Sequence, residues 1–239
     1  MRKNTPWNLL IFLAYAAGVI LFLIPRLRDF GVYILIGAVA LHITYTFSPR
    51  QRAAIKFLNA RKSIEKGDVK KAFQFVIQGT ALSQEKTLVN YLLSPFVKSK
   101  PHYMKLASML ENELNKNDTP FLRYIIASIY YQTGEMNKVF TLLKDLSKKE
   151  LDIKTIRLLG ASMMEKGDYE SALKLFKRVE PKRKVPNLDE LNVLLGIGLC
   201  YADTGNIKKA TEYYERVAKF NPSLPGLDKL YEKIHLEKK

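Results

Sequence analysis

The chain has 239 residues and a formal net charge of +16, so it is strongly basic overall. Its single cysteine, Cys200, excludes an intramolecular disulfide framework and a zinc site built from cysteines. We interpret Cys200 as a small buried thiol within a helix, with a reactive thiol as the alternative. Apolar residues are concentrated before Pro49 and charged residues after it. This pattern predicts an all-α chain in which residues 1–49 are a membrane anchor and residues 50–239 form a cytoplasmic helical domain.

Residues 7–24 and 30–47 are two apolar stretches of helical length. The first has no charged residue, and the second has only His42 as an ionisable residue. Each stretch would span roughly 27 Å as a helix, close to the roughly 30 Å of bilayer hydrocarbon. A polar turn from Pro25 to Asp29 separates them, so the sequence predicts a hairpin of two transmembrane helices. We interpret His42 as reaching the interface from near the end of its span, with a functional role as the alternative.

A secretory signal peptide is an alternative interpretation of the first apolar stretch, because Arg2 and Lys3 precede it. The one A-x-A match, Ala14 to Ala16, lies inside the apolar stretch, and a second apolar stretch follows at once. A signal peptide is therefore disfavoured. A buried soluble hairpin is also disfavoured, because neither stretch has a polar face.

Basic residues flank the predicted hairpin at both of its open ends. Arg2 and Lys3 precede the first stretch, and the second is followed by Arg50, Arg52, Lys56, Arg61 and Lys62. The two arginines of the turn, offset by an aspartate, weaken this asymmetry without reversing it. The positive-inside rule then places both termini in the cytoplasm and predicts a multi-pass protein of the cell (inner or plasma) membrane.

The segment that follows the second stretch is strongly basic. Residues 50–100 contain eleven Lys or Arg residues and three acidic ones. Anionic headgroups attract such residues at the bilayer surface, so we expect lipid contact near residues 50–71 through the five basic residues just named. A solvated face in a lysine-rich chain is the alternative. Nucleic acid is disfavoured as a partner, because no recognised nucleic-acid module is visible.

Four similar segments beyond Ser48 indicate internal repeats. Each contains a glycine followed by a polar residue and a helical pattern, at Gly67, Gly134, Gly167 and Gly205. These glycines are separated by 67, 33 and 38 residues, and the first interval equals two periods of about 34. A degenerate unit is therefore expected between the first two glycines, where residues 94–116 supply a helical pattern.

The last unit resembles the tetratricopeptide repeat family, whose small and large residues match Gly198, Tyr201, Gly205, Ala210, Tyr214 and Pro222. The preceding unit matches the family at Leu159, Gly160, Gly167, Ala172 and Phe176. The resemblance covers roughly residues 53–222 and implies an α-solenoid of about five helix–turn–helix units. Small residues would let the paired helices approach closely, and residues 224–239 would form a capping helix.

The resemblance also implies a concave groove, lined by the first helix of each unit, that binds another protein or a peptide. The residues expected to face it are Tyr124, Ser128, Tyr131, Lys154, Arg157 and Met164. Aromatic residues beside Lys and Arg suit a segment with acidic and apolar groups. The alternative is that the tyrosines only pack between repeats. The Lys and Asn set of the family's carboxylate-clamp subtype cannot be placed here, so binding of chaperone tails is disfavoured.

Catalytic patterns are missing from the sequence. His42, His102 and His235 are far apart, and there is no Gly-Lys-Ser/Thr phosphate loop or G-x-S-x-G elbow. We therefore expect no catalysis, no metal and no cofactor. The favoured function is a membrane-anchored scaffold or adaptor. The alternative is a structural subunit of a membrane complex, such as envelope-polysaccharide, secretion or assembly machinery, held mainly through its transmembrane hairpin.

Overall fold

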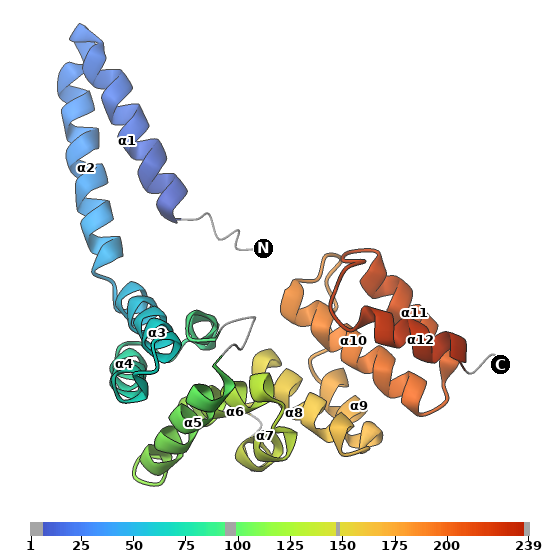
Figure 1. Cartoon of the computed structure of the whole chain (residues 1–239). Helices are drawn as coiled ribbons and strands as arrows, with labels where there is room; N and C mark the ends of the chain where they lie inside the picture. The colour runs from blue at the N-terminus through green and yellow to red at the C-terminus, as the bar shows by residue number, and fades with distance from the viewer. Residues whose placement is uncertain (1–6, 94–98, 147–148, 237–239) are drawn as a thin grey trace.

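In the computed structural model, a long helical hairpin projects from a curved stack of helices (Figure 1). The structure describes residues 7–93, 99–146 and 149–236, and every regular element in these ranges is helical. Helix α1 covers Trp7–Leu23, a 3-10 turn η1 covers Pro25–Leu27, and α2 covers Arg28–Thr46. The predicted all-α fold is confirmed, and the polar turn is shorter than expected because α2 already begins at Arg28.

The two helices of the hairpin approach closely where glycine replaces a side chain. A Cβ atom added at Gly18 would lie 2.7 Å from Cγ of Leu35, and one at Gly31 would overlap the backbone of Phe22. The hairpin is otherwise exposed: the helical segment Pro25–Tyr45 is only 11% buried. Exposed apolar side chains without a polar face would be unfavourable in water.

Only one of the two predicted spans meets the length and composition of a membrane-crossing helix within the described residues. The segment Pro25–Tyr45, of 21 residues, is long and apolar enough, whereas the other apolar segment, Leu10–Leu23, is shorter. The structure therefore supports one candidate span near the N-terminus. The multi-pass arrangement and the membrane that it occupies stay predictions.

The repeat domain begins at α3, where Ser48 caps the helix by accepting a hydrogen bond from the Gln51 amide at 3.2 Å. Helices then follow in pairs: α3 (Pro49–Glu65) with α4 (Val69–Leu82), η2 (Lys86–Tyr91) with α5 (Lys100–Leu114), α6 (Pro120–Thr133) with α7 (Met136–Leu143), α8 (Ile153–Glu165) with α9 (Tyr169–Lys177), and α10 (Leu188–Asp203) with α11 (Ile207–Ala218). Helix α12 (Leu227–Leu236) covers the last pair. The expected solenoid with a terminal capping helix is confirmed.

The degenerate second unit differs from the expectation. Its first member is the short 3-10 helix η2, which precedes residue 94 and packs between α3 and α6. Its second member is α5, which carries the helical pattern predicted for 94–116, with Pro101 in its first turn. Residues 94–98, including Pro95, lie outside the described residues. A 3-10 helix carries no turn glycine and no helical period, which is why the sequence pattern was not visible there.

Turn glycines and capping acids explain the recurring Gly-Asp pairs. Gly67, Gly134, Gly167 and Gly205 adopt φ values of 76° to 83° between paired helices, a region that favours glycine. The residue that follows often caps the next helix: Asp168 accepts from the Ser171 amide at 3.2 Å. These glycines therefore lie at the turns of the helix–turn–helix units that the resemblance implies.

Small residues allow close helix packing, as the resemblance implied. A Cβ atom at Gly160 would overlap the ring of Phe176, and one at Gly198 would lie 2.7 Å from Cδ2 of Leu230. Ala127, Ala172 and Ala210 are fully buried (0% exposed). Cys200 is also fully buried, which confirms its interpretation as a buried thiol and raises its pKa to about 12.

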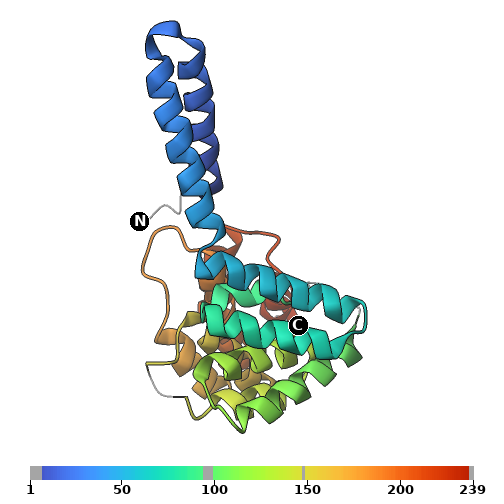
Figure 2. The ribbon, with the colours of Figure 1, turned by 90° about the vertical axis from the view of Figure 1, so that its left-hand side faces the viewer.

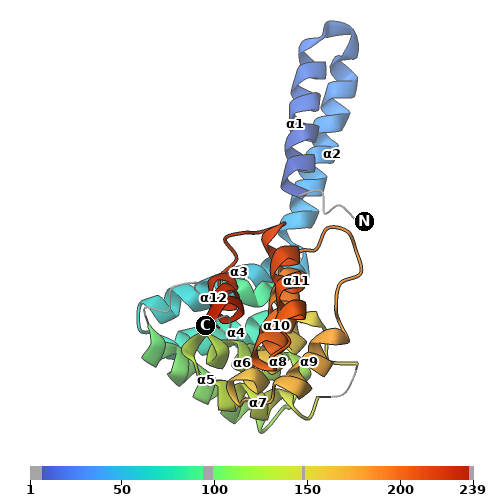
Figure 3. The same ribbon diagram turned by 90° about the vertical axis from the view of Figure 1, so that its right-hand side faces the viewer.

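The stack of helix pairs is curved. As a result, connections late in the chain lie at the end of the repeat domain from which the hairpin emerges. Figures 2 and 3 show that the connections after α9 and after α11 lie at the end of the repeat domain from which the hairpin emerges. Helix α7 and the turn between α10 and α11 lie toward the opposite end. Such curvature results from the small rotation between successive units.

Candidate functional site

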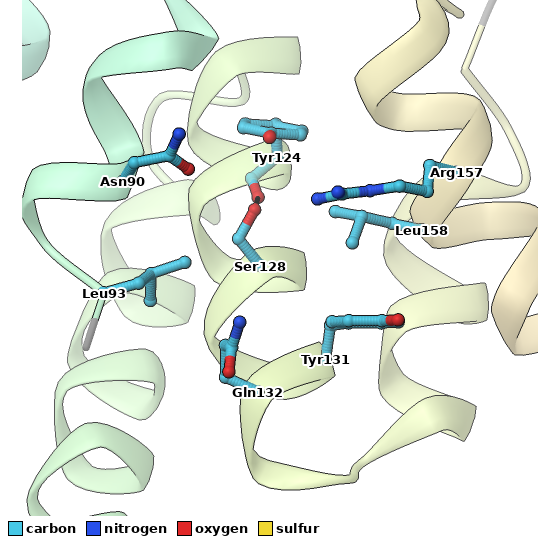
Figure 4. Close-up of a pocket in the computed structure, with 8 residues that line it drawn as sticks. All are labelled: Asn90, Leu93, Tyr124, Ser128, Tyr131, Gln132, Arg157 and Leu158. Carbon is cyan, nitrogen blue, oxygen red and sulfur yellow. Dashed lines mark hydrogen bonds between the residues drawn. The ribbon is translucent and has the colours of Figure 1, made fainter. Parts of the chain in front are cut away.

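The inner face of the stack has a pocket of about 230 Å³, formed where η2, α6 and α8 meet (Figure 4). Its lining residues are Asn90, Leu93, Tyr124, Ser128, Tyr131, Gln132, Arg157 and Leu158. Helix α6 contributes Tyr124, Ser128 and Tyr131, which are spaced by four and three residues and therefore share one helical face. Thr119 fixes the start of α6 by accepting a hydrogen bond from the Leu122 amide at 3.2 Å.

A second hollow of about 410 Å³ continues along the inner face from α6 and α8 to α10. It shares Tyr131, Gln132 and Arg157 with the first pocket, and it adds Met164 and Leu199. The two hollows together form one groove across three successive first helices. Of the six residues predicted to face a groove, the structure therefore brings together five, namely Tyr124, Ser128, Tyr131, Arg157 and Met164.

Lys154, the sixth predicted residue, lines neither hollow. Its Nζ atom lies 2.6 Å from Oδ2 of Asp189, and its side chain is only 15% exposed. This ion pair joins α8 to α10. The charge of Lys154 is therefore already neutralised by the next helix of the stack.

Arg157 is a groove residue with an unsatisfied hydrogen-bond donor. Its Nε atom is buried and has no hydrogen-bond acceptor within the described part of the chain. Its closest acid is Asp189, whose Oδ1 lies 3.6 Å from Nη1. Figure 4 shows the guanidinium extending from α8 toward Tyr124 and Ser128 of α6. A buried N–H donor without an acceptor costs about 1–3 kcal/mol, so an acceptor that enters the groove would be stabilised there.

The two tyrosines differ in burial: Tyr124 belongs to the buried core, whereas Tyr131 packs against that core and stays partly exposed. Tyr124 is 4% exposed, and burial raises the pKa of its phenol. Ser128 is also 4% exposed, and its hydroxyl donates to the Tyr124 carbonyl at 2.7 Å. Tyr131 and Gln132, by contrast, remain accessible at the groove surface. The accessible polar groups are therefore Tyr131, Gln132, Arg157 and Asn90.

Lys86 holds the wall of the groove together rather than carrying a free charge into it. Its Nζ atom donates to the Thr155 hydroxyl at 2.6 Å and to Asp152 at 3.0 Å, and it lies 5.1 Å from the centre of the Tyr124 ring. Although burial opposes the shift, hydrogen bonds from Thr155 and Lys86 hold the pKa of Asp152 below its ordinary value. The 3-10 helix η2 is thereby joined to α8.

Sequence reasoning missed four of the residues that line the first pocket, namely Asn90, Leu93, Gln132 and Leu158. Gln132 follows Tyr131 on a helix whose inner face was already recognised, so the helical period could have found it. Asn90 and Leu93 lie in and after η2, where no repeat pattern exists. No sequence signal placed them at the groove.

A model of the tetratricopeptide repeat matches residues 191–224, which cover most of α10 and α11. The last helix pair of the array therefore matches a tetratricopeptide repeat. A TPR repeat-containing protein of Methanocaldococcus jannaschii is 30% identical over 103 residues, which are 43% of this chain and 18% of that protein. This chain thus spans less than a fifth of the curated relative's length. The crystal structure of YrrB, described as a TPR protein with an unusual peptide-binding site, covers 77% of this chain and 91% of its own, with 17% identity and a TM-score of 0.46.

The five basic residues predicted to contact the membrane surface all lie on α3, the first helix of the tetratricopeptide array. Arg50 pairs with Glu85 at 2.9 Å and Arg61 with Glu65 at 3.0 Å. Lys56 lies 5.4 Å from the centre of the Phe75 ring. Arg52 and Lys62 are exposed. Within the described residues, no group of three or more His, Cys, Asp or Glu side chains could hold a metal ion.

Proposed function

We propose that this chain is a membrane-anchored adaptor whose tetratricopeptide groove binds an extended segment of a partner protein. The observation that carries the proposal is the guanidinium of Arg157, a residue that lines both hollows of the groove and whose buried Nε–H has no acceptor in the described part of the chain. A carboxylate of the partner would accept from this group, and a charge-assisted hydrogen bond is stronger than a neutral one. The bound segment would therefore be acidic at this point.

The remainder of the groove supports an extended and partly apolar segment. The two hollows share Tyr131, Gln132 and Arg157 and extend from η2 to α10. Leu93 and Leu158 line the first hollow, and Met164 and Leu199 line the second. Amide groups of Gln132 and Asn90 can hydrogen-bond a peptide backbone, whereas the apolar residues favour aliphatic side chains.

The anchor in this proposal is the hairpin of α1 and α2, with both termini on the cytoplasmic side. The segment Pro25–Tyr45 is long, apolar and almost entirely exposed, as a lipid-facing helix would be. Helix α1 packs against it along its length, with Gly18 in close contact with Leu35. The basic residues of α3 follow at once, which suits the side of the membrane that carries positive loops.

Site-specific photocrosslinking of the full chain in native membranes tests the groove. A benzoylphenylalanine at Gln132 lies in the groove, and one at Thr141 lies on the exposed surface of α7 in the outer layer. We expect a defined crosslinked species from position 132 and none from position 141. Arg157→Ala should reduce the crosslink about tenfold or more, since hydrogen bonds to charged groups contribute about 1.5–3 kcal/mol.

Arg178→Ala is the matched control, because Arg178 is an exposed arginine outside the groove. It should leave the crosslink unchanged. Equal labelling from positions 132 and 141, or an Arg157→Ala variant that crosslinks like the Arg178→Ala variant, would overturn the proposed binding site.

A further inference from the structure

The connection between α9 and α10, residues 178–187, lies at the end of the repeat domain from which the hairpin emerges (Figures 2 and 3). The connection is far from the hairpin in sequence. It lies at the hairpin end of the domain because the array is curved. The connection between α11 and α12 lies at the same end. If the hairpin spans the bilayer, both connections face the membrane surface.

The α9–α10 connection is held at its start by contacts to α11. Glu180 accepts a hydrogen bond from the Tyr213 hydroxyl at 2.6 Å and lies 3.2 Å from Nη1 of Arg216. Arg216 also donates from Nη2 to the carbonyl of Pro181 at 2.7 Å. The Pro181 side chain is buried. The chain therefore leaves α9 in a fixed direction.

The same connection is held at its other end by α10. Arg183 donates from Nε to Oε1 of Glu190 at 2.8 Å. Asn187 and Glu190 form a reciprocal capping box at the start of α10, and Pro186 is buried. Because both ends are fixed, the residues between them cannot fold back onto the array and are presented to the outside.

The presented residues combine positive charge with exposed aliphatic side chains. Lys182 and Lys184 are exposed, and neither has an ion-pair partner within the described part of the chain. Val185 is 62% exposed and Leu188 is 60% exposed, although both are apolar. No acidic residue lies between positions 181 and 188. Basic residues beside exposed aliphatic ones are the composition of segments that bind at a membrane interface.

The neighbouring connection carries a smaller set of the same kind. Lys219 and Phe220 follow α11, and both are exposed, the latter by 37%. Arg52 and Lys62 of α3, the helix that follows the hairpin, are exposed as well. Exposed positive charge is therefore present both on the helix next to the hairpin and on the connections at this end of the domain.

We infer that the α9–α10 connection is a second membrane contact, which docks the distal end of the array onto anionic lipid headgroups. Lys182 and Lys184 would face the headgroups, and Val185 and Leu188 would enter the interface. The inference rests on the proposed hairpin anchor. With contacts at α3 and at this connection, the array could not rotate freely about the joint between α2 and α3, and its groove would keep one orientation to the membrane.

Depth-dependent fluorescence quenching of the full chain in lipid nanodiscs tests this inference. A fluorophore is attached at Val185→Cys, while the buried Cys200 stays unlabelled, and quencher-labelled lipids are included in the discs. The discs contain phosphatidylcholine alone or mixed with phosphatidylglycerol. We expect quenching of the label in the mixed discs and much less in the neutral ones. The same fluorophore at Thr141→Cys, on the outer helix α7, should not be quenched in either.

Charge reversal tests the role of the lysines. Lys182→Glu with Lys184→Glu should lower the ratio of docked to undocked label at least tenfold in the mixed discs, since each basic residue near an anionic surface contributes about a fivefold change. The matched control is Lys144→Glu with Lys208→Glu, which changes the net charge equally at an exposed position just after α7 and at one on α11. It should leave the quenching unchanged. Circular dichroism and thermal unfolding of each variant establish that it is folded.

Two different failures can be told apart. If the chain enters the nanodiscs and the Val185→Cys label is quenched no more than the Thr141→Cys label, the hairpin anchor stands and the second contact is wrong. Equal loss of quenching in both charge-reversal variants would likewise overturn the contact at this connection. If the chain does not enter the nanodiscs at all, the anchor is wrong, and the second contact falls with it.

Discussion

The Nζ atom of Lys154 lies 2.6 Å from Oδ2 of Asp189, and both side chains are less than a quarter exposed. The same carboxylate lies 3.6 Å from Nη1 of Arg157. One acid on α10 thus balances two cations of α8 at the edge of the groove. Lys154 is held in this ion pair, whereas Nε of Arg157 has no acceptor in the described part of the chain. We therefore interpret Lys154 as a structural cation and Arg157 as the cation that a ligand can use.

Asp189→Asn should therefore have opposite effects on stability and on binding. The loss of the carboxylate leaves two neighbouring cations uncompensated, so the free energy of unfolding should fall by about 1–3 kcal/mol. An acidic ligand would then face a more positive groove and should bind more tightly. Urea unfolding of the full chain in detergent, followed by circular dichroism, measures the first effect. Glu212→Gln, at an exposed acid of α11, should change neither quantity.

Gly160→Ala should destabilise the fourth helix pair of the array. A methyl group at this position overlaps the ring of Phe176, which is itself 2% exposed and also contacts Gly196. Overpacking of this kind costs about 1–3 kcal/mol. Urea unfolding of Gly160→Ala, Phe176→Leu and the double variant forms a cycle. Leucine in place of the Phe176 ring should relieve the overlap with the added methyl group. The loss of stability in the double variant should therefore be smaller than the sum of the losses in the two single variants. Strict additivity would contradict this packing.

The stability of the α9–α10 connection should depend on pH through Glu180. Although burial opposes the shift, hydrogen bonds from Tyr213 and Lys177 hold the pKa of this carboxyl below its ordinary value of 4.5. A carboxyl whose pKa is lower in the folded state stabilises the fold above its unfolded pKa. That contribution is complete above about pH 4.5 and is lost as the pH falls through the folded pKa.

Glu180→Gln removes this titration. The variant should be less stable than the parent chain near pH 7, and the difference should shrink as the pH is lowered from about 5 to 3. Thermal unfolding at a series of pH values measures both curves. Glu212→Gln should follow the parent curve, because its exposed carboxyl has no partner in the described structure. A constant difference between the Glu180→Gln variant and the parent chain at all these pH values would show that Glu180 acts only through packing.

The repeats could be predicted from local sequence patterns. The contacts between repeats could not. Gly167 and Asp168 identify a helix turn from two adjacent residues, because φ and capping are set locally. The position of Tyr131 on the inner face follows from the helical period. The engagement of Lys154 by Asp189 depends on how α8 and α10 are rotated relative to each other. No short stretch of sequence specifies that rotation.

The curvature of the array could not be predicted from the sequence either. In the sequence alone, residues 181–186 can be recognised only as an insertion within the 38-residue interval between Gly167 and Gly205. Their position at the hairpin end results from rotations summed over several units, including the unit whose first member is the 3-10 helix η2. A basic stretch directly after α2 could be related to a membrane by its place in the chain. The α9–α10 connection is also basic, but it could be related to a membrane only once its position in the fold was known.

The topology of the hairpin separates the two-span anchor from a single span. If α1 and α2 both cross the bilayer, an N-terminal tag and a cysteine at Lys66 lie on the cytoplasmic side, and a cysteine at Arg28 lies outside. A membrane-impermeant maleimide applied to intact cells should then label Arg28→Cys, while Lys66→Cys should react only after the membrane is opened. Protease applied from outside should spare the N-terminal tag. Among the described residues, only the segment Pro25–Tyr45 has the full length of a span. Removal of the tag from outside, together with labelling at position 28, would therefore mean that α2 alone crosses.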